Sequence, residues 1–276
     1  MRKIDSLRIS LTQKCNLKCP YCHKEGQADS EKEISLAEID KLAVAARNLG
    51  IDRVKLTGGE PLLRKDVVEI VSALKKRGFS DISMVTNGVL LEKYARQLKD
   101  AGLGRVNIGC DSAEMNFLKN QKDMSAGLAA AKEAGLSPIK LNMIVMKGLN
   151  VHEIPKMMDF ARENGAILQL IELINFGSAE DNDFYKRHYY SLEEIEVGLQ
   201  EKAVSIKERH MQNRQQYDLG DLKVEVVRPF HNSFCENCTR VRVTPDGKVK
   251  PCLMRNDNLV IFENEDSLRK AIRLKV

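Results

Sequence analysis

The sequence contains no run of about 18 consecutive apolar residues, and no apolar stretch of signal length lies near its start. We therefore expect neither a membrane-spanning helix nor a secretory signal. Charge of one sign is also scarce, since the net charge is only +5 over 276 residues and basic residues are interspersed with acidic ones. These features predict a cytoplasmic protein with no membrane anchor and no nucleic-acid surface, whose small positive excess would suit an anionic small molecule.

The seven cysteines are not accompanied by an export signal, which argues against disulfide bonds and for metal ligands. Cys15, Cys19 and Cys22 have the spacing C-x3-C-x2-C and follow an alternating run over residues 7–12 that predicts a strand. A 4Fe-4S cluster has four iron corners and normally takes four thiolates, so three cysteines leave one iron open to a small molecule. The spacing therefore favours an iron-sulfur cluster with one free iron.

Other centres could use the same side chains. Cys19 and Cys22 form the C-x2-C of a dithiol redox couple, and with His23 they match the attachment pattern of haem c. Cys15 could join these three in a tetrahedral zinc site. Haem attachment goes with export, a dithiol couple needs no third cysteine, and adjacent Cys22 and His23 would make a cramped zinc chelate. These alternatives stay open, but each explains less than the cluster does.

After the first triplet, amphipathic helices alternate with apolar runs. Each helix is expected to end at a glycine, with the next apolar run following within a few residues; the glycines are Gly50, Gly78, Gly102, Gly135 and Gly165. Together with the first run this gives six strands, which must be parallel because helices separate them. No G-x-G-x-x-G follows the first strand, which counts against a doubly wound sheet. We predict an α/β fold with a partial (β/α)6 TIM-like barrel over residues 1–200 and a C-terminal extension over 201–276 that closes the barrel mouth.

Ligand sites in such folds gather at the carboxyl ends of the strands. One strand is expected to end at Thr57-Gly58-Gly59-Glu60-Pro61, where paired glycines would permit close backbone approach to a ligand and Glu60 could pair with an ammonium group. The same five residues also fit a plain strand-to-helix turn. Further residues expected around this cavity are Thr86 to Gly88, Gly109 to Asp111, Met146 to Gly148, Glu172 and Asn175.

The C-terminal extension carries a second triplet, Cys235, Cys238 and Cys252, around a hairpin expected to turn at residues 245–247. We favour a second 4Fe-4S cluster with one open iron, held by this triplet in the C-terminal extension. A zinc site, with His210 or His231 as the missing ligand, stays open. Two open clusters in one chain suggest that one binds a cofactor and the other a substrate.

Several cations could form an anion site near the second triplet. Arg240 and Arg242 follow Cys238 in strand register, so both side chains would lie on one face, and arginine suits phosphate oxygens. Lys147, at a strand end, and Arg8, on the first strand, could contribute to the same site. Taken singly, each of these residues also fits an ordinary surface charge.

The chain resembles the radical S-adenosylmethionine (SAM) superfamily, and within it the molybdenum cofactor biosynthesis protein A family of GTP 3′,8-cyclases. The resemblance covers nearly the whole chain. The matching stretches are LRISLTQKCNLKCPYCH, LTGGEPLLRKD, TNG at Thr86, KGLN at Lys147, QLIE at Gln169 and FCENCTRVRVTPDGKVKPCL. The first triplet alone indicates the superfamily, whereas the C-terminal C-x2-C-x-R-x-R-x9-C pattern is more specific.

The resemblance implies the roles of particular residues. The first triplet would hold a 4Fe-4S cluster whose free iron binds SAM, and the residues placing that cofactor would be Tyr21, Gly58, Gly59 and Glu60. The second triplet would hold a 4Fe-4S cluster that binds the substrate. The cations around its triphosphate would be Arg8, Lys55, Lys147, Arg240 and Arg242. Lys55 stands where the family usually has arginine, which keeps the charge but loses the fork of donors.

The implied activity is that of a radical SAM lyase. A 5′-deoxyadenosyl radical would convert GTP to 3′,8-cyclo-7,8-dihydro-GTP, the first step of molybdenum cofactor biosynthesis. A low-potential electron donor of the ferredoxin or flavodoxin type would be a partner, and a homodimer is allowed for. Two alternatives remain: a radical SAM paralogue acting on another nucleotide or a peptide, and a non-catalytic Fe-S or zinc protein.

Overall fold

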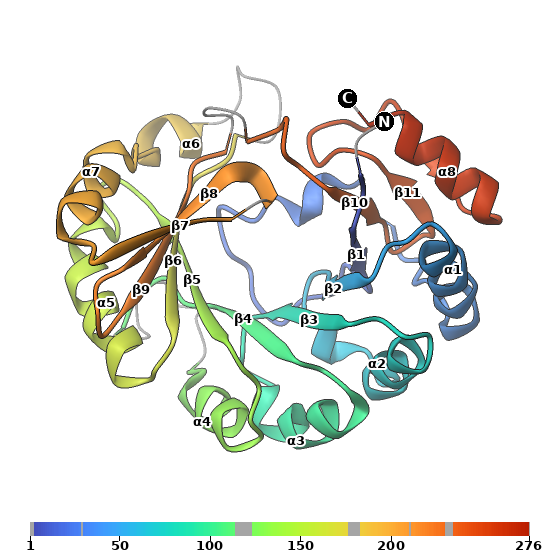
Figure 1. Cartoon of the computed structure of the whole chain (residues 1–276), viewed down its shortest axis with the longest axis horizontal. Coiled ribbons are helices and arrows are strands. Elements are labelled where there is room, and N and C mark those ends of the chain that lie inside the picture. Colours follow the sequence, from blue (N-terminus) through green and yellow to red (C-terminus); the bar gives the residue numbers. More distant parts are fainter. Residues whose placement is uncertain are drawn as a thin grey trace.

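The computed structural model describes residues 3–28, 30–113, 123–175, 183–209, 211–229 and 234–275. Its centre is an arc of six parallel strands that follow one another in sequence order (Figure 1). The strands are β1 (Ser6–Ser10), β2 (Arg53–Thr57), β3 (Asp81–Thr86), β4 (Arg105–Gly109), β5 (Ile139–Val145) and β6 (Ile167–Glu172). Sequence order across a parallel sheet is the arrangement of a barrel, so the predicted partial barrel is confirmed.

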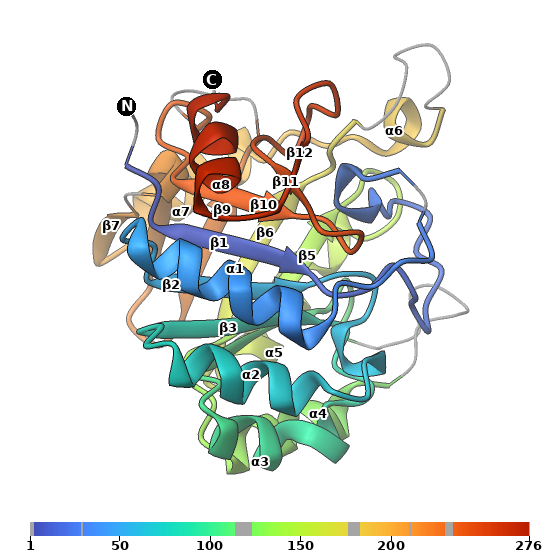
Figure 2. The same ribbon diagram turned by 90° about the vertical axis from the view of Figure 1, so that its right-hand side faces the viewer.

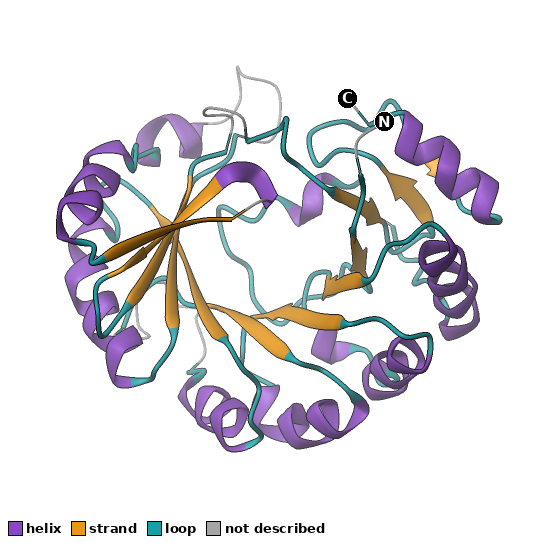
Figure 3. Ribbon diagram, viewed as in Figure 1, coloured by secondary structure: helices purple, strands orange, loops and turns teal. Residues whose placement is uncertain are grey.

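The helices lie on the outer side of the arc (Figure 3). They are α1 (Leu36–Asn48), α2 (Val67–Lys76), α3 (Leu91–Ala101), α4 (Ser125–Glu133) and α5 (Ile154–Glu163). Short 3-10 turns η1 to η4 cover Lys24–Gly26, Pro61–Leu63, Val151–Glu153 and Met211–Asn213. No helix in the described ranges is long and apolar enough to cross a membrane.

Local sequence signals account for where these helices begin and end. At the start of α1, the Ser35 hydroxyl accepts from the Glu38 N–H at 3.2 Å, and the Glu38 carboxylate accepts from the Ser35 N–H at 2.8 Å. This capping box pairs two N–H groups that would otherwise lack partners. Beyond the other end, Gly50 has a φ of 77°, which glycine adopts without strain. The chain can therefore turn directly into β2.

The C-terminal part extends both edges of the arc. β9 (Lys223–Val227) pairs in parallel with β6, and β10 (Arg240–Val243) pairs in parallel with β1. The remaining elements are α6 (Asp183–His188), α7 (Glu193–Lys202), β7 (Ser205–Arg209), β8 (Arg214–Asp218), β11 (Lys248–Lys250), β12 (Val260–Ile261) and α8 (Glu265–Arg273). All of these strands belong to one sheet of order β12-β11-β10-β1-β2-β3-β4-β5-β6-β9-β8-β7.

The two faces of the sheet differ in chemistry. Alternate residues of β1, such as Leu7 and Ile9, are fully buried in the hydrophobic core. The opposite face is polar, because Arg8 lies in register with Lys55 on one side and Arg242 on the other. Typical TIM barrels fill this interior with branched apolar side chains. A polar interior instead suits a polar ligand.

Candidate active site at the carboxyl ends of the strands

The first cysteine triplet lies in the loop that follows β1, on the side of the molecule where the parallel strands end (Figure 2). Cys15 and Cys22 are exposed, and Cys19 is partly buried. Burial, together with the neighbouring Asp111, Cys22 and Cys15, raises the pKa of Cys19 to about 11. Metal binding replaces the thiol proton and compensates the charge on sulfur, so this crowded set of thiols suits a bound cation better than free thiolates.

The spacing of the metal-ligating side chains bears on the kind of metal centre. Across the described residues, no three His, Cys, Asp or Glu side chains are gathered closely enough to hold a single metal ion. Tetrahedral zinc would require sulfur atoms about 3.8 Å apart. In a four-iron cluster each cysteine binds its own iron, so the sulfurs lie farther apart. The described side chains therefore do not form a ready-made site for a single metal ion, and a cluster at the first triplet stays a prediction. His210 and His231, the proposed extra zinc ligands, lie outside the described residues.

The paired glycines bring the turn after β2 against the cysteine loop. The Gly59 N–H donates to Thr12 O at 2.7 Å, and the Glu60 N–H donates to Lys14 O at 2.8 Å. A Cβ atom on Gly59 would lie 2.3 Å from Lys14 O, and one on Gly58 would lie 2.5 Å from Thr12 O. The glycines therefore allow close approach to the loop that carries the cysteines, whereas the predicted approach to a ligand stays a prediction.

Glu60 connects this turn to the end of β3. Its side chain is fully buried and accepts from the Leu62 N–H at 3.0 Å, the Thr86 hydroxyl at 2.8 Å and the Asn87 N–H at 2.8 Å. Burial raises the pKa of Glu60, while these donors oppose the rise. The carboxylate thus holds two strand ends together. A contact between Glu60 and the ammonium group of a cofactor stays a prediction.

Tyr21 is held by a residue that the sequence had placed only at a strand end. Its hydroxyl donates to Asp111, whose other carboxylate oxygen accepts from the Ile144 N–H at 2.9 Å. Burial raises the pKa of Asp111 to about 6. The adjacent Cys110 is a core residue, because its sulfur contacts Met157 and burial raises its pKa to about 12. Asp111 therefore anchors the cysteine loop across β4 and β5.

The second triplet flanks β10 and β11. Lys275 Nζ lies 3.5 Å from Cys238 Sγ and donates to Arg240 O at 2.7 Å and to Pro251 O at 3.1 Å. Burial alone would raise the pKa of Cys238, but Lys275 and the nearby arginines outweigh it and lower that pKa. Cationic surroundings of this kind favour the thiolate, which is the metal-binding form. Lys275 was not predicted from the sequence, where nothing connects it to Cys238.

Three arginines form a cationic cluster on the inner face beside the second triplet. Arg8 pairs in register with Arg242, and Ser6 pairs with Arg240. Arg240 and Arg242 are 9% and 5% exposed, and their burial lowers both pKa values. The Nε atoms of all three arginines are buried and have no hydrogen-bond partner among the described residues. Buried donors without a partner indicate a site for an anion.

The two lysines predicted for the anion site differ in position, because Lys55 is half-buried on the inner face and Lys147 is exposed. Lys55 Nζ donates to Asn107 Oδ1 at 2.9 Å, and burial with neighbouring cations holds its pKa well below the ordinary value. Lys55 thus lies on the same inner face as the arginine cluster. Lys147 is exposed, and no contact in the described ranges joins its side chain to that cluster. At the end of β6, Glu172 accepts from the Leu192 N–H and from Arg228.

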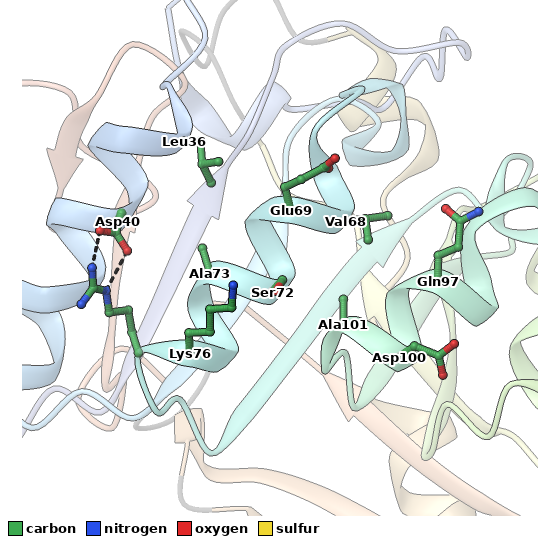
Figure 4. Close-up of a pocket in the computed structure, with 11 residues that line it drawn as sticks. Leu36, Asp40, Val68, Glu69, Ser72, Ala73, Lys76, Gln97, Asp100 and Ala101 are labelled. Carbon is green, nitrogen blue, oxygen red and sulfur yellow. Dashed lines mark hydrogen bonds and ion pairs between the residues drawn. The ribbon is translucent and has the colours of Figure 1, made fainter.

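A separate groove lies on the outer surface, between α1, α2 and α3 (Figure 4). Its lining includes the ion pair between Arg77 and Asp40, whose atoms are 2.5 Å apart. None of the lining residues belongs to the predicted site. The groove is therefore separate from the predicted site at the strand ends and on the inner face of the arc.

Residues 9–161 match the family described as Radical SAM superfamily, and residues 166–274 match Molybdenum Cofactor Synthesis C. SuiB from Streptococcus suis, solved with bound SAM, has the same fold with a TM-score of 0.64 and 15% identity; the match covers 91% of this chain and 58% of that chain. The anSMEcpe structure with bound AdoMet and a peptide has a TM-score of 0.62 and 16% sequence identity, and the match covers 97% of this chain and 80% of that chain. Together, the fold and the site define a radical SAM enzyme.

Sequence relatives identify the family more closely. The probable GTP 3′,8-cyclase of Methanothermobacter thermautotrophicus is 46% identical over 98% of this chain and 90% of its own length. The probable GTP 3′,8-cyclase of Thermococcus kodakarensis is 47% identical over 95% of this chain and 88% of its own length. The chain belongs to the GTP 3′,8-cyclase family, as predicted. Membership in it implies SAM and two 4Fe-4S clusters as cofactors.

Proposed function

We propose that the protein is a GTP 3′,8-cyclase, a radical SAM lyase that forms 3′,8-cyclo-7,8-dihydro-GTP in molybdenum cofactor biosynthesis. The observation that carries the proposal is the cluster of Arg8, Arg240 and Arg242, whose three buried Nε atoms have no hydrogen-bond partner among the described residues. Arg8 lies on the strand that leads into the first triplet, and the other two lie between Cys238 and Cys252. A phosphorylated substrate held there would lie between the two triplets.

The remaining site residues can be given roles on this basis. Cys15, Cys19 and Cys22 would hold one cluster, and the second triplet would hold the other. The first cluster and SAM, when bound, would supply one-electron radical chemistry next to the ribose of the substrate. Tyr21 and Gly59 would shape the SAM side of the site.

The chain's own cations would bind and orient the triphosphate. Guanidinium groups suit phosphate oxygens because they present several donors in one plane. Lys55 would add a further cation to this phosphate-binding surface on the inner face. Lys147 is exposed and would have to extend from the molecular surface to contact the phosphates. We also propose that residues 1–200 form the barrel and 201–276 its extension, that a ferredoxin- or flavodoxin-type donor reduces the enzyme, and that the chain is able to form a homodimer.

The direct test is product analysis under anaerobic conditions. Reconstituted enzyme given GTP, SAM and dithionite should form 5′-deoxyadenosine while consuming GTP, and it should contain about eight irons per chain. SAM cleavage with unchanged GTP would point to another substrate. One or two zinc ions with no iron would end the proposal.

Arg240→Ala and Arg242→Ala should each weaken GTP binding about 10- to 100-fold, because each removes charge-assisted hydrogen bonds to phosphate. Guanosine lacks phosphate, so its dissociation constant should change little. Equilibrium binding of both ligands to each variant measures the difference. Arg77→Ala, on the outer groove, is the control and should affect neither ligand. Equal losses for GTP and guanosine would remove the arginines from the phosphate site.

A further inference from the structure

The turn η1, directly after the first triplet, places a carboxylate inside the arginine cluster. Glu25 is 6% exposed and accepts hydrogen bonds from the Arg8 guanidinium and, at 3.1 Å, from the Thr57 hydroxyl. Its second oxygen lies 3.8 Å from Arg242 Nε. Burial alone would raise the pKa of Glu25, but Arg8, His23 and Arg242 outweigh it and lower the pKa to about 2. Glu25 is therefore a buried anion between two arginines.

Glu25 neutralises only part of the positive charge around it. Four cations share this region of the inner face: Arg8, Arg240, Arg242 and Lys55. The Nε–H groups of the three arginines donate no hydrogen bond to any described residue. Carboxylate and phosphate oxygens accept from guanidinium groups with the same geometry, and a triphosphate brings more oxygens and more charge. The substrate phosphates and Glu25 would thus compete for Arg8 and Arg242.

The backbone conformation of the turn η1 favours the release of Glu25 from the arginines. Lys24 and Glu25 have φ values of 45° and 55°, in the left-handed region that residues other than glycine rarely adopt. The contacts of Glu25 hold the turn in this conformation, and so does Lys250 Nζ, which donates to Gly26 O at 2.6 Å. If Glu25 lost its arginine partners, the turn could relax toward a less strained conformation.

We propose that Glu25 is an internal counter-ion that occupies a phosphate position of the substrate site and leaves it when the triphosphate binds. The identity of the triphosphate as that of GTP rests on the proposed function. Because η1 begins two residues after Cys22, displacement of Glu25 would move the loop that carries the first triplet. Glu25 is therefore a positioning residue that couples substrate binding to the cofactor side of the site.

Glu25→Gln should strengthen binding of inorganic triphosphate to the reconstituted enzyme about tenfold, because it removes a competing negative charge at short range. Anaerobic titration calorimetry measures this. Asp40→Asn is the matched control: it also removes one carboxylate from an arginine partner, but on the outer groove, and should change affinity less than twofold. Unchanged or weaker binding to Glu25→Gln would overturn the proposal.

Two further measurements separate competition from a merely structural role. In Glu25→Gln, KM for GTP should fall while kcat changes less, and Glu25→Asp, which keeps the charge, should restore most of the wild-type KM. In the wild-type enzyme, hydrogen exchange at residues 24–28 should become faster on adding inorganic triphosphate. Slower or unchanged exchange there would contradict the proposal even if Glu25→Gln failed to fold. Triphosphate binding and hydrogen exchange require no turnover, so those two results stay separate from whether GTP is converted.

Discussion

Cys15→Ala should abolish reductive cleavage of SAM, with a loss of about 1,000-fold or more, because the first cluster would keep only two of its three protein ligands. Cys15 lies in the loop that follows β1, which the Gly59 turn and Asn16 fix against the ends of neighbouring strands. The measurements are the yield of 5′-deoxyadenosine with dithionite as reductant, and the iron content of the reconstituted protein.

Cys252→Ala should give a different result, because Cys252 belongs to the second triplet. We expect SAM cleavage to continue while conversion of GTP falls about 100-fold or more, with iron near four per chain in both variants. Cys110→Ala is the control: its sulfur lies in the core, so iron content should be unchanged. Full turnover by either triplet variant, or SAM cleavage by Cys15→Ala, would show that the roles are assigned wrongly.

The local part of the fold could be predicted from the sequence because its signals lie within a few residues of one another. The capping box at Ser35 and the glycine at Gly50 each act within one helix turn, and the strand periodicity acts within five or six residues. The partners of β9 and β10 depend on contacts with strands far away in the sequence. Local pattern does not specify such partners, so the continuation of the sheet beyond both ends of the arc was not predicted.

The residues of the site divide in the same way, into those with a local sequence signal and those that depend on distant contacts. Its cysteines and the arginines of β10 were recognisable because their spacing is short and their chemistry is specific. Glu25 and Lys275 were missed, and Asp111 was expected at a strand end but without its partner Tyr21, because each of these residues matters through a distant segment. The contact between Lys250 and Gly26, 224 positions apart, is of the same kind. Single acidic or basic residues in a loop carry no spacing signal, so only the assembled structure could single them out.

The glycine turn was predicted to allow close approach, and the structure makes the consequence measurable. Gly59→Ala should lower the free energy of unfolding by about 3 kcal/mol, because the new methyl group would meet two backbone atoms that cannot rotate away. The Cβ would lie 2.3 Å from Lys14 O and 2.6 Å from Gln13 O, so the turn and the cysteine loop must separate. The hydrogen bonds from Gly59 and Glu60 to the cysteine loop would be lost or lengthened.

Separation of the turn from the cysteine loop should also reduce SAM cleavage about 100-fold, since a displacement of about 1 Å at a reacting centre costs that much. Denaturant unfolding and the yield of 5′-deoxyadenosine measure the two effects. Gly198→Ala is the control, because its Cβ would meet nothing within 4 Å and alanine favours a helix interior. Normal stability and normal cleavage in Gly59→Ala would mean that the cysteine loop is not held by this turn, and that the glycines serve the bound cofactor alone.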